Sequence, residues 1–191
     1  MLSLHVPADV IKYVEDYVFA YRLSLADLTY QDDKLGTHMF EHCEVLPTVI
    51  IYEQVTTVED YVFAECYTLH TLDFRNKIVG EYMFYNDRGL INVTVSSVDE
   101  NGVPTNTVEE IRYGAFENCY NIQTMVIPFV GQFADSDESV YNLDETKEYY
   151  GYSNSVFGWM FGKVRTGETL DESKYSSVNQ MYSLVVNQTG E

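Results

Sequence analysis

The chain of 191 residues has few basic residues, since 11 Lys and Arg stand against 30 Asp and Glu for a formal net charge of −19. Nucleic acids and anionic membrane surfaces attract clusters of Lys and Arg, so the sequence argues against both as partners. No apolar run reaches 18 residues, which argues against direct membrane insertion. The first ten residues, MLSLHVPADV, also lack the basic start and apolar core of a signal peptide.

What the chain does contain is an internal repeat. The string VEDYVFA occurs at residues 14–20 and again at 58–64. Alignment on its Phe finds five copies, separated by 21, 23, 21 and 32 residues, at Phe19, Phe40, Phe63, Phe84 and Phe116. Apolar residues recur five positions before each Phe and six, nine and eleven positions after it. This spacing matches the Leu-x-x-Leu-x-Leu core of leucine-rich repeats.

The same offsets predict the secondary structure of each repeat. The last apolar positions alternate with outward ones, as in Leu72-Asp73-Phe74, and so predict a short half-buried strand. The Phe and the positions three and six after it share one helical face, and Asp16 and Asp60 stand where an N-cap residue would. We predict an α/β solenoid with one parallel, concave sheet and short helices on the convex side. An ordinary α/β domain with chance self-similarity is the alternative.

We predict a single leucine-rich repeat domain over residues 1–191. Its expected parts are a partial repeat at 1–13, repeats at about 14–34, 35–57, 58–78, 79–110 and 111–128, an insertion at 129–180 and a last strand at 181–187. The partial repeat holds a strand because Leu4-His5-Val6-Pro7 matches Met125-Val126-Ile127-Pro128. Because neither end looks capped, we expect a fragment of a longer protein.

The three Cys residues lie at one repeat position. Cys43, Cys66 and Cys119 each follow a repeat Phe by three residues, which predicts a column of buried thiols. A Cys43–Cys66 disulfide between neighbouring repeats is the alternative. His38 and His42 have a spacing that can hold zinc on a helix, but the repeat register places His38 in an aromatic ladder with Tyr17, Tyr61 and Tyr82 and Cys43 in the core. We therefore expect neither a metal nor a cofactor.

The string IRYGAFENCYNIQTMVIP at residues 111–128 resembles the BspA-type leucine-rich repeats of bacterial cell-surface proteins. The stretches IPFVG at 127–131 and FGWMFG at 157–162 resemble a variant repeat of that family common in gut Firmicutes. The pattern departs at Arg22 and Asp87, which stand where other copies have Cys, and looser packing is expected there. The resemblance implies a secreted or surface-attached protein that recognises other molecules and has no enzymatic activity.

The first expected function is recognition or adhesion, by binding a host or microbial protein or glycan. A structural spacer that presents other domains is the alternative, and a hydrolase using acidic loop residues around 135–148 is a third reading. For binding, the outward strand positions of the concave face are candidates: Asp27, Thr29, Thr48, Ile50, Thr71, Asp73, Asn92, Thr94, Thr124 and Val126. Thr and Val are also common in strands for structural reasons alone.

The predicted insertion supplies a second candidate surface. Its tyrosines lie in a strongly acidic stretch, and Tyr offers a large contact area at low entropic cost. The candidates are Tyr141, Tyr149, Tyr150 and Tyr152. For the FGWMFG stretch, the alternating aromatic residues instead predict a buried strand beneath the last repeat.

Overall fold

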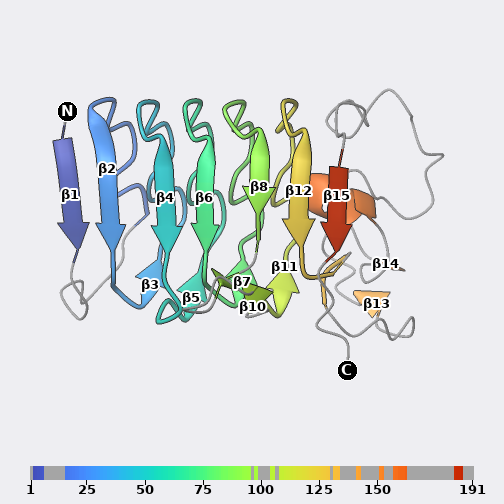
Figure 1. Ribbon diagram of the computed structural model, residues 1–191. Coiled ribbons are helices and arrows are strands. Elements are labelled where there is room, and N and C mark those ends of the chain that lie inside the picture. Colours follow the sequence, from blue (N-terminus) through green and yellow to red (C-terminus); the bar gives the residue numbers. More distant parts are fainter. Residues whose placement is uncertain are drawn as a thin grey trace.

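The fold of the chain is a row of seven parallel strands. The computed structural model describes residues 2–6, 16–95, 97–98, 104–105, 108–129, 131–133, 141–142, 151–152, 157–162 and 183–186. The strands lie side by side and point in one direction (Figure 1), in the order β1-β2-β4-β6-β8-β12-β15. They are β1 (Leu2–Val6), β2 (Leu25–Tyr30), β4 (Thr48–Ile51), β6 (Thr71–Phe74), β8 (Asn92–Thr94), β12 (Thr124–Ile127) and β15 (Ser183–Val186).

The pairing of these strands confirms the alignment of the repeats. Leu4 pairs with Leu28 at one end of the sheet, and Met125 pairs with Leu184 at the other. Burial alternates along β4 and β12, where every second residue is buried. A shift of one residue in the strand pairing would turn the apolar side chains of that strand away from the core, so the apolar spacing fixes this register.

Short strands line the sheet's lower edge in Figure 1. β3 (Lys34–Leu35) pairs in parallel with β5 (Thr57–Val58), and β7 (Ile78–Val79) pairs in parallel with β11 (Glu110–Ile111). Each contains the apolar residue that opens a repeat, and all four of these residues are buried. Two further pairs are antiparallel: β9 (Ser97–Val98) with β10 (Pro104–Thr105), and β13 (Tyr141–Asn142) with β14 (Gly151–Tyr152).

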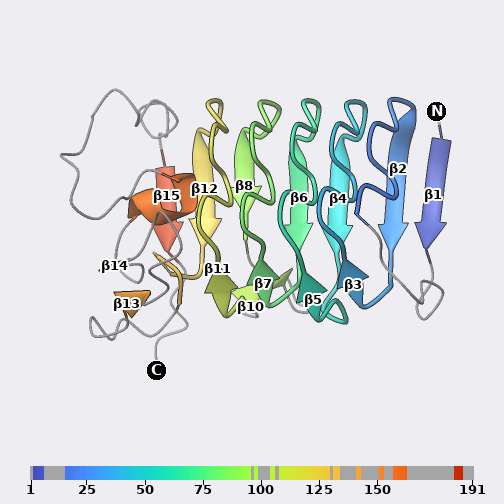
Figure 2. The same ribbon diagram turned by 180° about the vertical axis from the view of Figure 1, so that it is seen from behind.

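The side of the repeats opposite the sheet, which we call the turn side, corrects the prediction of short helices. The described part of the chain has no α-helix, and turns cross behind the strands instead (Figure 2). Two residues of each repeat have positive φ angles, two positions before and two positions after the Phe, as at His38 (φ 53) and His42 (φ 56). This left-handed backbone interrupts a right-handed helix.

The hydrogen bonds on the turn side explain why these turns are stable. An α-helix would pair the backbone N–H of Phe40 with the carbonyl of Gly36. Here the Phe40 N–H donates to the carbonyl oxygen of Val62 at 2.8 Å, and the Phe63 N–H donates to that of Met83 at 2.9 Å. The turns of neighbouring repeats thus satisfy each other's backbone groups, as the strands do on the sheet side.

The repeat Phe residues form the centre of the core. Phe40, Phe63, Phe84 and Phe116 are buried, and their rings stack with centroids 5.2 to 5.9 Å apart. Phe19 stacks on Phe40 at 5.3 Å but is only partly buried, so it lies at the margin of the core rather than inside it.

The FGWMFG stretch is a 3₁₀ helix, η1 (Phe157–Phe161), so the prediction of a strand here is wrong. Its backbone continues the hydrogen bonding of the turn side: the N–H groups of Gly114 and Phe116 donate to the carbonyls of Trp159 and Met160, at 2.9 and 2.8 Å. Trp159 and Phe161 are buried, as expected of residues packed under the last repeat. None of the described helices is both long and apolar enough to cross a membrane.

Candidate binding surface

The predicted binding residues of the sheet lie in two rows that run across the strands. In the first row, Thr48 pairs with Thr71 and Asn92 pairs with Thr124. In the second row, Ile50 pairs with Asp73, Asp73 with Thr94, and Thr94 with Val126. Asp27, Thr71, Asn92 and Thr94 are exposed, while Thr29, Thr48, Ile50, Thr124 and Val126 are half-buried.

Strand β1 extends both rows with two residues that the prediction left out. Ser3 pairs with Asp27, and His5 pairs with Thr29; both are exposed. The match of Leu4-His5-Val6 to Met125-Val126-Ile127 contained this information, because the residue between two core positions of a strand points away from the core. At the other end, Ser183 and Val185 of β15 pair with Thr124 and Val126.

Most side chains of the two rows can form hydrogen bonds. The Thr124 hydroxyl donates to the Asn92 side-chain oxygen of the neighbouring strand, and the Thr71 hydroxyl lies 2.9 Å from the His70 ring nitrogen Nδ1. Hydroxyl and amide groups of this kind both donate and accept hydrogen bonds. Within the rows, only Asp27 and Asp73 are acidic and no Lys or Arg occurs. We call this surface the sheet face.

A ladder of aromatic rings runs along the turn side, as the repeat register predicted. The rings of Tyr17 and His38 stack at 4.5 Å, those of His38 and Tyr61 at 4.8 Å, and those of Tyr61 and Tyr82 at 4.8 Å. The stack ends at Tyr82, because the equivalent residue of the next repeat is Gly114, which has no ring. A Cβ atom at Gly114 would lie only 2.5 Å from the Cε1 atom of Tyr82.

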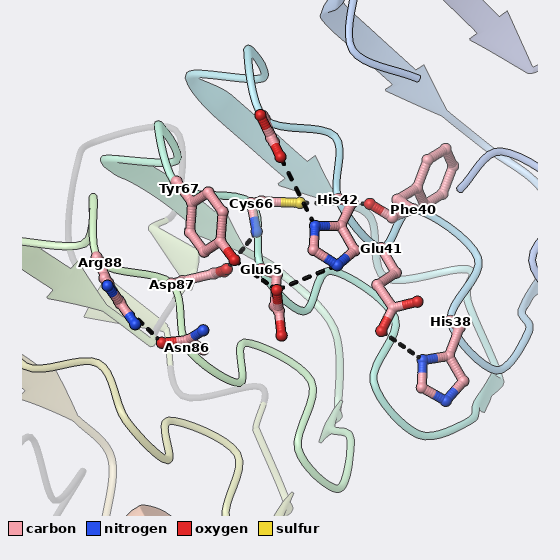
Figure 3. A network of polar contacts seen from close by, with 11 residues as sticks. His38, Phe40, Glu41, His42, Glu65, Cys66, Tyr67, Asn86, Asp87 and Arg88 are labelled. Carbon is pink, nitrogen blue, oxygen red and sulfur yellow. Dashed lines mark hydrogen bonds and ion pairs between the residues drawn. The ribbon is translucent and has the colours of Figure 1, made fainter. Parts of the chain in front are cut away.

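The two His residues of the ladder region contact carboxylates. The Nδ1 atom of His38 lies 3.0 Å from Glu41, and the Nε2 atom of His42 lies 3.1 Å from Glu65 (Figure 3). Burial holds the pKa of Tyr61 at about 12, above its ordinary value. No group of three potential metal ligands occurs in the part of the chain that the structure describes. These side chains thus form ring stacks and close contacts with carboxylates along the turn side.

The three cysteines are buried and free, so the alternative of a Cys43–Cys66 disulfide is wrong. Each thiol lies against the carbonyl oxygen of the Phe one repeat earlier: Cys43 donates to Phe19 at 3.4 Å, Cys66 to Phe40 at 3.3 Å and Cys119 to Phe84 at 3.0 Å. Burial raises the pKa of the Cys43 thiol to about 11, and it raises the pKa of the other two thiols well above their ordinary value. These thiols are therefore poor nucleophiles.

Two of the predicted insertion tyrosines lie directly opposite each other. Tyr141 of β13 pairs with Tyr152 of β14 in an antiparallel ladder. Tyr149 and Tyr150 lie outside the described residues, as do the acidic residues proposed for a hydrolase: Asp135, Asp137, Glu138, Asp144, Glu145 and Glu148. The use of this segment as a binding surface stays a prediction.

Comparison with known proteins identifies a family and a similar structure. The family described as the BspA type leucine rich repeat region matches residues 12–142, in 6 copies. A leucine rich cell surface protein from Faecalibacterium prausnitzii A2-165 has a similar crystal structure, with a TM-score of 0.51 and 18% sequence identity. That match covers 87% of this chain and 33% of the other, so the chain spans about a third of its length, and the likeness concerns the fold alone.

No curated protein sequence matches the chain. The family match nevertheless covers more than half of the residues, and it includes every repeat Phe and all three buried thiols. The parallel strand order and the stacked cores described above are what such repeats require. The chain belongs to the family of BspA-type leucine-rich repeat proteins.

Proposed function

We propose that the chain is a non-enzymatic recognition module that works outside the cell and binds a protein or a glycan on its sheet face. The observation that carries this proposal is the pair of rows of small side chains, which keep register from β1 to β12. Neighbouring strands are about 4.8 Å apart, so an extended ligand would meet a hydrogen-bonding group at each strand.

The distribution of charge supports the sheet face over the rest of the surface. The chain has a net charge of −19, yet its two rows contain only Asp27 and Asp73 as charged residues. A ligand on the sheet face would therefore lose little hydration from charged groups, which keeps the cost of binding low. Repeat proteins of this architecture present extended surfaces for binding.

The extracellular location is the second part of the proposal. It is supported by the similar fold of a protein that is described as a cell surface protein. It is also consistent with cysteines that are single, buried and unreactive, since these need no reducing environment to stay free.

The test starts with a glycan and protein array probed with the purified chain, followed by affinity measurements on the best binder. Two variants change the sheet face, Asp27→Lys and Thr71→Arg. Their matched controls, Asp33→Lys and Thr56→Arg, make the same changes at exposed positions outside the sheet. We expect the sheet variants to raise the Kd by about tenfold or more, because bulky or oppositely charged groups would block a flat surface.

The controls should bind as the unchanged chain does. Equal affinity of all four variants, with unchanged circular dichroism, would reject the sheet face as the site. A chain that binds nothing on either array would favour the spacer function instead.

A further inference from the structure

One member of the buried thiol column is a carboxyl group. The column consists of the residues three positions after each repeat Phe, and in the fourth repeat this residue is Asp87. Its exposed fraction is 0%, the same as that of Cys66 and Cys119 on either side of it. Asp is rarely buried completely, so the contacts of this side chain need an explanation.

Only one of the two carboxyl oxygens of Asp87 has a hydrogen bond. Its Oδ1 atom accepts the backbone N–H of Cys66 at 2.6 Å (Figure 3). The Oδ2 atom is buried and has no hydrogen-bond partner. An orphaned acceptor of this kind costs free energy, and it costs more if the group carries a charge.

The cysteines of the column indicate how the second oxygen can be satisfied. Each thiol is a donor to the Phe carbonyl one repeat earlier. The equivalent acceptor for Asp87 is the carbonyl of Phe63. An ionised carboxylate cannot donate a hydrogen bond, whereas a neutral carboxylic acid has one O–H donor.

The groups around Asp87 give an ionised carboxylate little support. Glu65 and Cys66 face it from the preceding turn, and Cys119 faces it from the following one; none of these three is a cation. The neighbouring cation, Arg88, is exposed, and its Nε donates to the Asn86 side-chain oxygen at 3.0 Å. Burial raises the pKa of Asp87 well above its ordinary value, and the N–H of Cys66 only partly opposes this shift.

We propose that Asp87 is held as a neutral acid which replaces a thiol in the column. Its ionisation loosens the packing of the turn that contains Asp87 against the two neighbouring turns, residues 60–67 and 113–120. The contact between these three turns is thus a pH-sensitive joint within the repeat row. It is tighter in acid and looser as the pH rises.

The sign of this effect follows from where the proton is bound. The unfolded chain releases the proton near pH 3.9, while the folded chain keeps it to a higher pH. Between these two pKa values the folded state holds one more proton than the unfolded state. Its folding equilibrium constant therefore falls tenfold for each unit of rising pH, and the loss ends at the folded-state pKa.

The direct test is ¹³C NMR of the folded chain with labelled Asp carboxyl carbons, titrated from pH 4 to pH 8. The resonance that disappears in Asp87→Asn belongs to Asp87. We expect it to have the shift of a neutral acid at pH 6, about two pH units above the ordinary pKa of an Asp carboxyl. A carboxylate shift for Asp87 at pH 6 would overturn the proposal.

Unfolding by urea over the same pH range tests the consequence. Asp87→Asn and Asp87→Cys both keep a hydrogen-bond donor at this position but have no carboxyl group there. We expect the folding equilibrium constant of the unchanged chain, divided by that of either variant, to fall tenfold for each unit of rising pH. Asp33→Asn, a matched change at an exposed position, should show the same fall as the unchanged chain. If Asp87→Asn and the unchanged chain have the same pH dependence, the joint does not exist. Hydrogen exchange of the Cys66 amide, which needs no variant, should accelerate with pH beyond its intrinsic increase.

Discussion

The imidazole ring of His38 stacks on the phenol ring of Tyr61, with the ring centroids 4.8 Å apart and the planes 6° from parallel. Tyr17 covers the other face of the imidazole at 4.5 Å. Aromatic pairs contribute about 0.5–1.5 kcal/mol beyond the burial of their area. The ladder therefore helps to hold the first repeats together on the turn side.

His38→Ala removes two of these ring contacts. We expect it to lower the free energy of unfolding by about 1–2 kcal/mol, as measured by urea denaturation. His38→Tyr is the matched control, since tyrosines occupy the equivalent positions of neighbouring repeats with similar φ angles. If the Tyr variant is destabilised as much as the Ala variant, the stacking of rings is not what matters at this position.

Phe63→Ala tests the core. The ring of Phe63 is 1% exposed and stacks between Phe40 and Phe84. Removing it should cost about 3–5 kcal/mol of unfolding free energy, through lost burial and the cavity that remains. Phe19→Ala should cost less, because Phe19 is only partly buried. Equal losses at the two positions would contradict the described core.

Thiol labelling tests the cysteine column. At pH 8 the folded chain should react slowly with a thiol reagent, because the raised pKa values and burial leave almost no accessible thiolate. The same chain in urea should label all three cysteines quickly. Rapid labelling of even one cysteine before unfolding would show that the column is open there.

The insertion is tested by replacing residues 135–152 with a short Gly-Ser linker. We expect the thermal unfolding of the repeats to be nearly unchanged, since β13 and β14 pair with each other and belong to a separate two-stranded sheet. Affinity for the ligand found on the arrays is the second measurement. A loss of affinity with the repeats intact would move the site to the tyrosine-rich segment, and full affinity would leave it on the sheet face.

The sequence predicted the strands well because their apolar spacing has a single structural solution. Leu72 and Phe74 must point to the core together, and this fixes where Asp73 lies in the strand pairing. It also placed the outward rows correctly, apart from the omission of Ser3 and His5. The binding role of these rows has no comparable signature, because Thr and Val suit strands with or without a ligand.

The turn side was predicted less well because a stacked turn and a helix bury the same residues. The Phe and Cys positions face the core in both. Residues with a left-handed backbone distinguish a stacked turn from a helix, and Gly or Asn at these positions would have indicated such a backbone in the sequence. Only Gly114, Asn86 and Asn118 give that signal, while Tyr and His occupy most of the other such positions. The sequence showed that Asp87 departs from the repeat pattern. It did not show that one carboxyl oxygen of Asp87 lacks a hydrogen-bond partner, because residue spacing does not reveal the thiol–carbonyl hydrogen bonds of the equivalent cysteines.

The hydrogen bonds between repeats have a mechanical consequence. On both the sheet and the turn side they join one repeat to the next, and so they lie along the length of the row. A stretching force between the first and last strands would load these junctions in series, and the weakest would open first. Each repeat that unfolds in this way would increase the distance between the two ends of the chain by roughly 70 Å, at about 3.3 Å or more per extended residue. The row is in this sense an extensible tether, whose length changes in repeat-sized steps.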